Sequence, residues 1–145
     1  MSAFDEGFNV GYDEGERYGL NPWPRWIHAY ATGALFHWGF NEPARPDIVS
    51  GYRSPVKQRQ MRNRWDAGDR VGLVARPAVR SWHTTGQAWD VENGVAGFPW
   101  YRWTIMQYIK PRVNVEIRWG GNFSSPDPVH FDVPIADQPP SIYDI

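Results

Sequence analysis

The chain has 145 residues, of which 41% are hydrophobic and 21% charged, so it can bury one substantial core but has no room for a second domain. Its formal net charge of −1 argues against a dedicated nucleic-acid binder, and the absence of cysteine excludes disulfides and thiolate metal ligands. No apolar run approaches membrane-spanning length, so we expect no membrane partner.

Residues 1–20 form an acidic, glycine-rich segment. Three aromatic residues recur every four positions, which favours a docked amphipathic helix, although three glycines at the same spacing weaken it. The aromatic residues are Phe4, Phe8 and Tyr12, and the glycines are Gly7, Gly11 and Gly15. The segment lacks the basic and then apolar pattern of a secretory signal, so we expect synthesis in a cytoplasm.

Three further helices are predicted. Asn21 as the cap and Pro22 in the first turn open one that Gly39 ends, and Ser54-Pro55 opens another that closes near Gly68. The third begins at Pro99 and is stopped by Lys110-Pro111. Its predicted core stripe consists of Trp100, Trp103, Met106, Tyr108 and Ile109.

Four short strands are predicted between these helices, within residues 47–54, 88–91, 113–119 and 130–133. Alternation in the second strand places Ala88 and Asp90 on one face. Together the elements indicate a small α+β domain, with a short and mainly antiparallel sheet flanked by helices. The tail, 134–145, is expected to be irregular.

Two stretches bring metal-ligating side chains together. The stretch from Ser81 places His83 and Asp90 seven residues apart around a Thr-Thr-Gly turn, and Asp127 to His130 adds a second imidazole and a second carboxylate. Two histidines and one aspartate suit zinc, whose catalytic sites usually have three protein ligands and one open position. We therefore predict that His83, Asp90 and His130 bind zinc at the sheet edge and that Asp127 remains for proton transfer. The other two histidines, His28 and His37, fall on nearly opposite faces of one helix and are interpreted as structural.

The pattern Ser-x-His-x-x-Gly-x-Ala-x-Asp from Ser81, followed by Arg118-Trp119-Gly120-Gly121 and Asp-x-x-His, resembles the VanY-like zinc peptidases of bacterial cell walls. The resemblance runs from about Ser50 to Val133. It implies that residues 1–145 form a single zinc peptidase domain acting on the peptidoglycan stem peptide. It also implies action on the wall after lysis-linked release or as part of a phage particle, where other particle proteins are partners.

The Ser-Gly-Tyr-Arg-Ser segment also matches this family, which implies that Arg53 holds the substrate or stabilises the oxyanion. A guanidinium suits that role because it stays charged and presents a planar fork. Asp127 is the predicted base that takes a proton from water and passes it to the leaving amine. Ser81 is expected to brace the ligand loop by hydrogen bonding, and Gly86 to permit the turn that returns Asp90.

Other carboxylates compete with Asp127 for the role of base. Asp132 and Glu92 are both candidates, and Glu116 is a weaker one. Asp132 shares a strand face with His130, so its alternative role is to fix the tautomer of that imidazole.

The form of the second motif favours one branch of the family. Family carboxypeptidases generally carry glutamate in the base position, whereas the endolysin-type L-alanyl-D-glutamate endopeptidases carry aspartate, as here. One departure is Asn122-Phe123, where that branch commonly has Asp-Trp. Trp119 and Phe123 are expected to line the cleft or to pack in the core.

Two alternatives stay open. One is a D-alanyl-D-alanine carboxypeptidase, and the other is a zinc-containing wall-binding or structural phage protein without catalysis. The basic segment from Arg53 to Arg80 either steers an anionic substrate or is a solvated helix face. Binding of this segment to nucleic acid would be salt-dependent, and we do not expect it.

Overall fold

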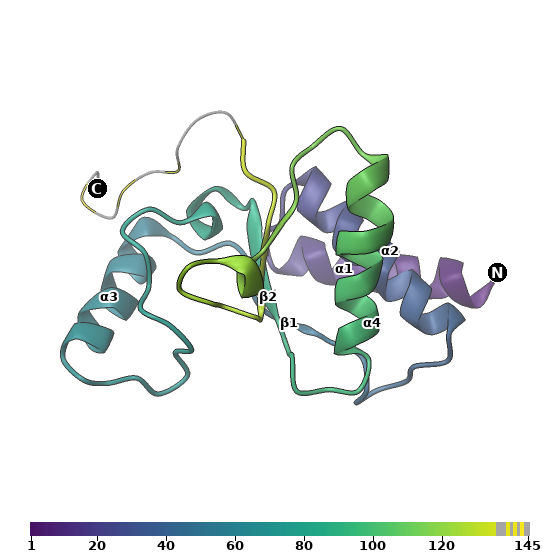
Figure 1. The fold of residues 1–145 in the computed structure, drawn as a ribbon, viewed down its shortest axis with the longest axis horizontal. Coiled ribbons are helices and arrows are strands. Elements are labelled where there is room, and N and C mark those ends of the chain that lie inside the picture. Colours follow the sequence, from purple (N-terminus) through teal and green to yellow (C-terminus); the bar gives the residue numbers. More distant parts are fainter. Residues whose placement is uncertain (136–138, 140, 142, 144–145) are drawn as a thin grey trace.

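The computed structural model describes residues 1–135, 139, 141 and 143 of the chain. Its α-helices are α1 (Ala3–Arg17), α2 (Pro22–His37), α3 (Pro55–Asp66) and α4 (Phe98–Trp103). Its strands are β1 (Ile48–Ser50), β2 (Ala88–Val91), β3 (Arg118–Trp119) and β4 (His130–Asp132). The strands form one antiparallel sheet in the order β1-β2-β4-β3. Helices α1, α2 and α4 lie on one side of the sheet and α3 on the other (Figure 1), which confirms the predicted α+β domain.

The first helix packs against the second through its glycines. Gly7, Gly11 and Gly15 follow one another at four-residue intervals on α1, and all three are buried. A Cβ atom at Gly11 would lie 2.8 Å from the Thr32 Cβ and 2.9 Å from the Ala29 Cα. The predicted helix is confirmed, and its glycines have a packing role. They reduce helix propensity but let the two helix backbones approach closely.

Replacing Gly11 by alanine should lower the free energy of unfolding by about 1–3 kcal/mol, because overpacking at the backbone of α2 outweighs the gain in helix propensity. Urea unfolding followed by circular dichroism measures this difference. The matched control is Asn9→Ala on the exposed face of α1, which should be neutral or slightly stabilising. Equal stability of Gly11→Ala and wild type would mean that the interface relaxes without cost.

Helices α2 and α3 occupy the predicted segments, but the start of α2 differs in one contact. Asn21 stands at the cap position, yet its side chain makes no capping hydrogen bond. Its Nδ2 instead donates to the Thr85 carbonyl oxygen at 2.7 Å. The start of α2 is thereby tied to the loop that carries His83. None of the described helices is long and apolar enough to cross a membrane.

The face of α4 that enters the core is not the predicted one. Trp100 and Trp103 are 51% and 44% exposed and pack around Trp38 at the surface. After α4 the chain continues as a wider π-helical segment (Thr104–Ile109), which shifts the residues that face inward. The residues of this stretch that join the core are Phe98, Tyr101, Ile105 and Ile109. Of the predicted stripe, Ile109 is buried and Met106 packs half-buried against the core, whereas Tyr108 and the two tryptophans are exposed. Tyr101 supplies the core aromatic ring instead.

The strand predicted over 113–119 pairs only at its end. Arg118 pairs with Asp132 and Trp119 with Phe131, and β4 has only three residues to offer. Val113, Val115 and Ile117 pack against the core without strand pairing. The alternation therefore predicted burial correctly and strand length incorrectly.

The tail predicted as irregular, 134–145, lies mostly outside the described residues. In its described part, Ser141 forms an isolated bridge with Arg80. The Arg80 guanidinium also donates to the Pro139 carbonyl oxygen at 2.9 Å. These contacts bring the tail back to the segment that precedes the first motif.

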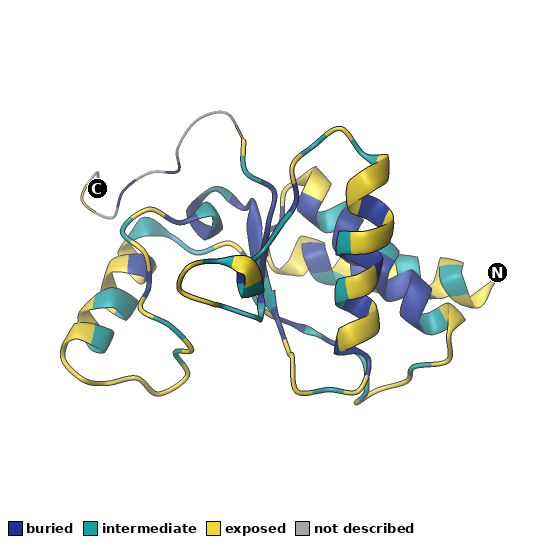
Figure 2. Ribbon diagram, in the orientation of Figure 1, coloured by how far each residue is buried: buried dark blue, intermediate teal, exposed yellow. Residues whose placement is uncertain are grey.

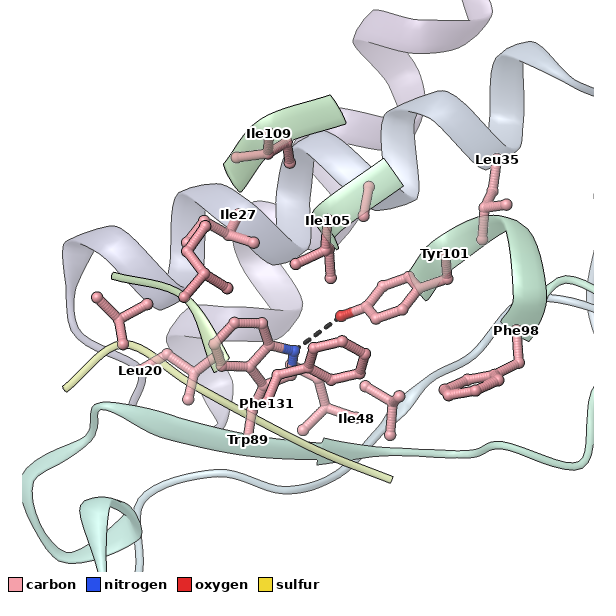
Figure 3. Packing of buried hydrophobic residues seen from close by; sticks show 14 residues of the cluster. Leu20, Ile27, Leu35, Ile48, Trp89, Phe98, Tyr101, Ile105, Ile109 and Phe131 are labelled. Carbon is pink, nitrogen blue, oxygen red and sulfur yellow. Dashed lines mark hydrogen bonds between the residues drawn. The ribbon is translucent and has the colours of Figure 1, made fainter. Parts of the chain in front are cut away.

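The two faces of the sheet differ in character. Trp89 and Val91 of β2 point into the core with Phe131 of β4, where Figure 3 shows the rings packed together. Figure 2 shows buried residues concentrated in the strands and on the inward faces of the helices. Asp90 pairs with His130 across β2 and β4. Because neighbouring residues of a strand point to opposite faces, this pair lies on the face turned toward α3.

A buried polar chain crosses the core beneath that pair. Trp89 Nε1 donates to the Tyr101 hydroxyl at 2.8 Å (Figure 3). The Tyr101 oxygen and His28 Nδ1 are 2.7 Å apart, and His28 Nε2 and Glu14 Oε1 are also 2.7 Å apart. All groups are satisfied if Tyr101 donates to Nδ1 and Nε2 donates to Glu14. His28 is thus structural, as predicted, and links α2 to α1 and α4.

Candidate metal centre and cleft

Three side chains come together where the two central strands meet. His83 lies on a short 3-10 helix (Trp82–Thr85), Asp90 on β2 and His130 at the start of β4. Asp90 Oδ1 is 3.3 Å from His83 Nε2 and 3.2 Å from His130 Nδ1. The ligand atoms all lie within 4.8 Å of one another, so the three residues could hold a metal ion. Asp90 and His130 lie on the two central strands, so the group is on a face of the sheet and not on one of its outer strands.

The spacing of these atoms fits zinc. Bonds of ~2.0–2.1 Å at tetrahedral angles separate neighbouring ligand atoms by about 3.3 Å. The measured distances from the Asp90 oxygen to the two nitrogens, 3.3 and 3.2 Å, agree with that value. Two imidazoles and one carboxylate are also a ligand set that zinc accepts, with a fourth position left open. The residues present therefore could hold a zinc ion: their chemistry suits it, two of the three separations match the tetrahedral value, and all three are within 4.8 Å.

Each imidazole is oriented by the nitrogen that faces away from the group. His83 Nδ1 donates to the Gly51 carbonyl oxygen at 2.8 Å, which leaves Nε2 as the ligand atom. His130 Nε2 donates to Asp132 Oδ2 at 2.7 Å, which leaves Nδ1. Such outer hydrogen bonds fix the tautomer and the ring orientation of metal ligands.

Local structure explains how the first two ligands meet. Ser81 caps the 3-10 helix by accepting the His83 N–H at 3.2 Å, and its carbonyl oxygen accepts the Thr84 hydroxyl at 2.6 Å. Gly86 ends the helix at φ 74°, in the left-handed region that favours glycine. The chain then turns into β2 and brings Asp90 back beside His83. Ser81 thus makes the hydrogen bonds expected of it in this loop, and Gly86 stands at the expected turn.

Burial and neighbouring charge shift the pKa values of two ligands in opposite directions. Burial raises the pKa of the Asp90 carboxyl, but His83 and His130 outweigh it and hold that pKa well below its usual range. Burial lowers the pKa of the His130 imidazole, but its hydrogen bonds to Asp132 and Asp90 outweigh this effect and raise the pKa to about 9. The group is thus a tightly balanced set of opposite charges.

Asp127 reaches the same cleft on a tight turn. Its N–H donates to the Gly120 carbonyl oxygen at 2.8 Å, and its own carbonyl oxygen accepts the His130 N–H at 3.1 Å. Its half-buried side chain lines the cleft together with the three ligands. Burial raises the pKa of the Asp127 carboxyl, and Asp90 adds to that effect against the opposing charges of His130, His83 and Arg53.

Trp119 and Phe123 were expected to line the cleft or to pack in the core, and each does one of the two. Phe123 lines the cleft, where its ring lies 5.6 Å from that of His130. Trp119 packs against the core instead. Its Nε1 donates to the Pro128 carbonyl oxygen at 2.8 Å and so supports the turn that carries Asp127.

Arg53 also lines the cleft, beside Asp90. Its Nη2 is 3.8 Å from Asp90 Oδ2, and its side chain is 11% exposed. Its backbone N–H donates to the His83 carbonyl oxygen at 2.9 Å. Burial lowers the pKa of the guanidinium against the charges of Asp90 and Asp127, so Arg53 remains a cation held close to the ligand group.

The cleft has a volume of about 1270 Å³ and runs from the ligand group along α3 and the loop of residues 71–78. Of the competing carboxylates, Asp132 also lines it but is engaged by His130 and Arg118. Glu92 and Glu116 are not among the residues that line it. Of these carboxylates, Asp127 is therefore the one that lines the cleft beside the three candidate ligands without being engaged by both a histidine and an arginine.

Sequence reasoning missed two residues of this site. Arg118 donates to Asp132 from Nε at 2.7 Å and from Nη2 at 2.9 Å, and so holds the carboxylate that orients His130. Gln58 is buried behind Arg53. Arg118 stands inside a recognised motif, which was a signal for it, whereas nothing in the spacing around Gln58 marks it.

Replacing Asp132 by asparagine should weaken zinc affinity by about 10–100-fold, because the amide cannot hold both Arg118 and His130 as the carboxylate does. Competition with a chromophoric chelator measures the dissociation constant. Asp69→Asn is the matched control, since Asp69 makes a comparable pair with Arg64 at the exposed surface. An unchanged zinc affinity in Asp132→Asn would remove the outer carboxylate from any role in metal binding.

The fold and the site together define a small α+β domain with a possible metal centre on its open sheet face. No protein-family model matches the chain, and no curated protein matches it either. Among solved structures, the L-Ala D-Glu endopeptidase ChiX of Serratia marcescens matches with a TM-score of 0.54 and 21% sequence identity. The match covers 92% of this chain and 87% of that chain. The chain therefore shares the fold of this endopeptidase.

Proposed function

We propose that the chain is a zinc-dependent hydrolase of the peptidoglycan stem peptide, related to the VanY-like peptidases, and that it cleaves between L-alanine and D-glutamate. The observation that carries the proposal is the convergence of His83, Asp90 and His130 beside Asp127 in one cleft. The fold shared with an L-Ala D-Glu endopeptidase supports this choice of substrate. The aspartate at position 127 supports the endopeptidase branch over the carboxypeptidase branch.

Zinc, when bound, would lower the pKa of water and polarise the scissile carbonyl. Asp127 takes the proton of the attacking water and later donates it to the leaving amine of D-glutamate. Its raised pKa suits the second step. A general acid works best when its pKa lies near the pH at which the enzyme acts, and the shift brings the pKa of Asp127 closer to neutral pH. Arg53 faces the cleft as a fixed cation and stabilises the negative charge that develops on the carbonyl oxygen.

The experiment is hydrolysis of purified peptidoglycan and of a synthetic stem peptide, followed by mass spectrometry. The expected products carry a new carboxylate on L-alanine and a new amine on D-glutamate, and a chelator should abolish their formation until zinc is restored. Loss of the terminal D-alanine alone would instead identify a carboxypeptidase. Intact stems with zinc-loaded protein at high concentration would reject hydrolysis and favour a zinc-containing binding protein.

A further inference from the structure

The helix that borders the cleft buries a single side chain, and that side chain is polar. Gln58 is the one buried residue of α3, every residue of which the structure describes, and it is 1% exposed. Helices usually bury apolar side chains, because a buried amide must find partners for both its carbonyl oxygen and its nitrogen. The partners of Gln58 therefore indicate what this residue is for.

Gln58 joins two walls of the cleft. Its Oε1 accepts a hydrogen bond from Arg53 Nη1 at 2.7 Å, and its Nε2 donates to the Ala78 carbonyl oxygen at 2.7 Å. Arg53 follows β1, whereas Ala78 belongs to the loop of residues 71–78 that lines the cleft beyond the ligand group. One buried amide thus fixes a guanidinium and a loop backbone to the same point of α3.

Arg53 lines the cleft, and its hydrogen bonds do not use all of its N–H groups. Nη1 donates to Gln58 and Nη2 donates to the Ser50 hydroxyl, both at 2.7 Å. Each of these nitrogens carries two hydrogens, so each keeps one that these bonds do not use. With both nitrogens anchored, the plane of the guanidinium cannot rotate freely, and its remaining donors keep one direction beside Asp90.

We propose that Gln58 is a positioning residue, which sets the plane of the Arg53 guanidinium so that its unused N–H groups meet the oxygen that becomes negative during hydrolysis. The effect of Gln58 on catalysis rests on the function proposed above. Its effect on the orientation of Arg53 does not, because that orientation is a property of the free protein. The same amide also fixes the position of the loop of residues 71–78 relative to Arg53.

The first test is a double-mutant cycle on the zinc-loaded protein with the stem peptide as substrate. Gln58→Leu removes both hydrogen bonds at similar volume and should lower kcat by about 10–100-fold, with a smaller change in KM and unchanged zinc affinity. In the Arg53→Ala background the same change should have an effect at least about 5-fold smaller, because only the hydrogen bond to the loop of residues 71–78 is then lost. Gln58→Glu keeps an acceptor for Arg53 and should recover part of kcat. Gln60→Leu, exposed on the same helix, is the control and should match wild type.

The second test needs no substrate. In nitrogen-15 spectra at low temperature, the Arg53 Nη protons of the wild type should give resolved, slowly exchanging signals, which Arg53→Lys identifies by their loss. Gln58→Leu should restore free rotation and merge them. Persistence of the resolved signals in Gln58→Leu, or equal fold losses of Gln58→Leu with and without Arg53, would overturn the proposal. Failure of the wild type to cut any stem peptide would reject the proposed function alone, since the spectra still decide whether Gln58 orients Arg53.

Discussion

Asp127→Asn is expected to reduce kcat for stem-peptide cleavage by about 10²–10⁴-fold while zinc content stays at the wild-type level. The substitution preserves the shape of the side chain and the backbone hydrogen bonds that place it on its turn. It removes the negative charge and, with it, the capacity to accept and return a proton. Rates measured by mass spectrometry, together with metal analysis of the same samples, separate loss of the base from loss of the metal.

The pH dependence of the wild type provides a second check on this role. A base must be ionised, so the rate should fall as the pH drops through the pKa of Asp127. Because that pKa is raised above the ordinary value of 3.8, the fall should occur at a higher pH than for an exposed aspartate. Ser125→Ala, in the same loop and also lining the cleft, is the matched control and should keep the wild-type rate. Wild-type turnover by Asp127→Asn would transfer the base role to another group.

The meeting of His83 and Asp90, the first two candidate ligands, was predictable because it depends on short-range structure. Gly86 permits a left-handed turn, and the alternation of β2 directs Asp90 away from the core side that Trp89 occupies. The third ligand depends on the register in which Asp90 faces His130. Such a register cannot be read from spacing along the chain, so the inclusion of His130 depended on the suitability of imidazole as a zinc ligand and on the resemblance of Asp-x-x-His to a known motif.

The residues that sequence reasoning misplaced are governed by packing between distant segments. Trp100 and Trp103 follow an apolar periodicity, but α2 and the sheet leave room for Tyr101, whose hydroxyl meets Trp89 and His28 in the core. Gln58 carries no periodic signal either, because its burial depends on how the loop of residues 71–78 folds over α3. Local propensity predicted the helices well, while the partners of their polar side chains required the fold.

Zinc is expected to raise the melting temperature of the wild-type protein by about 5–10 °C at a free concentration near 100 times its dissociation constant. Binding to the folded state alone contributes about 2.7 kcal/mol at that ratio, and a domain of this size gains a few degrees for each kcal/mol. The expectation follows from the geometry of the ligand group, whose three donor atoms converge only in the folded chain. Thermal unfolding with zinc and with a chelator measures the difference.

His83→Ala should lose most of this zinc-dependent increase, because two remaining ligands hold zinc far more weakly than three. The relevant quantity is the difference, for each variant, between the melting temperature with zinc and the melting temperature with a chelator. This difference is needed because removal of the imidazole also leaves the Gly51 carbonyl oxygen without its donor, which changes stability by itself. His37→Ala is the matched control, because His37 is exposed at the end of α2 and should keep the full increase. An equal increase in His83→Ala would mean that zinc binds elsewhere on the chain, and the convergence of His83, Asp90 and His130 would then reflect ion pairing rather than a metal centre.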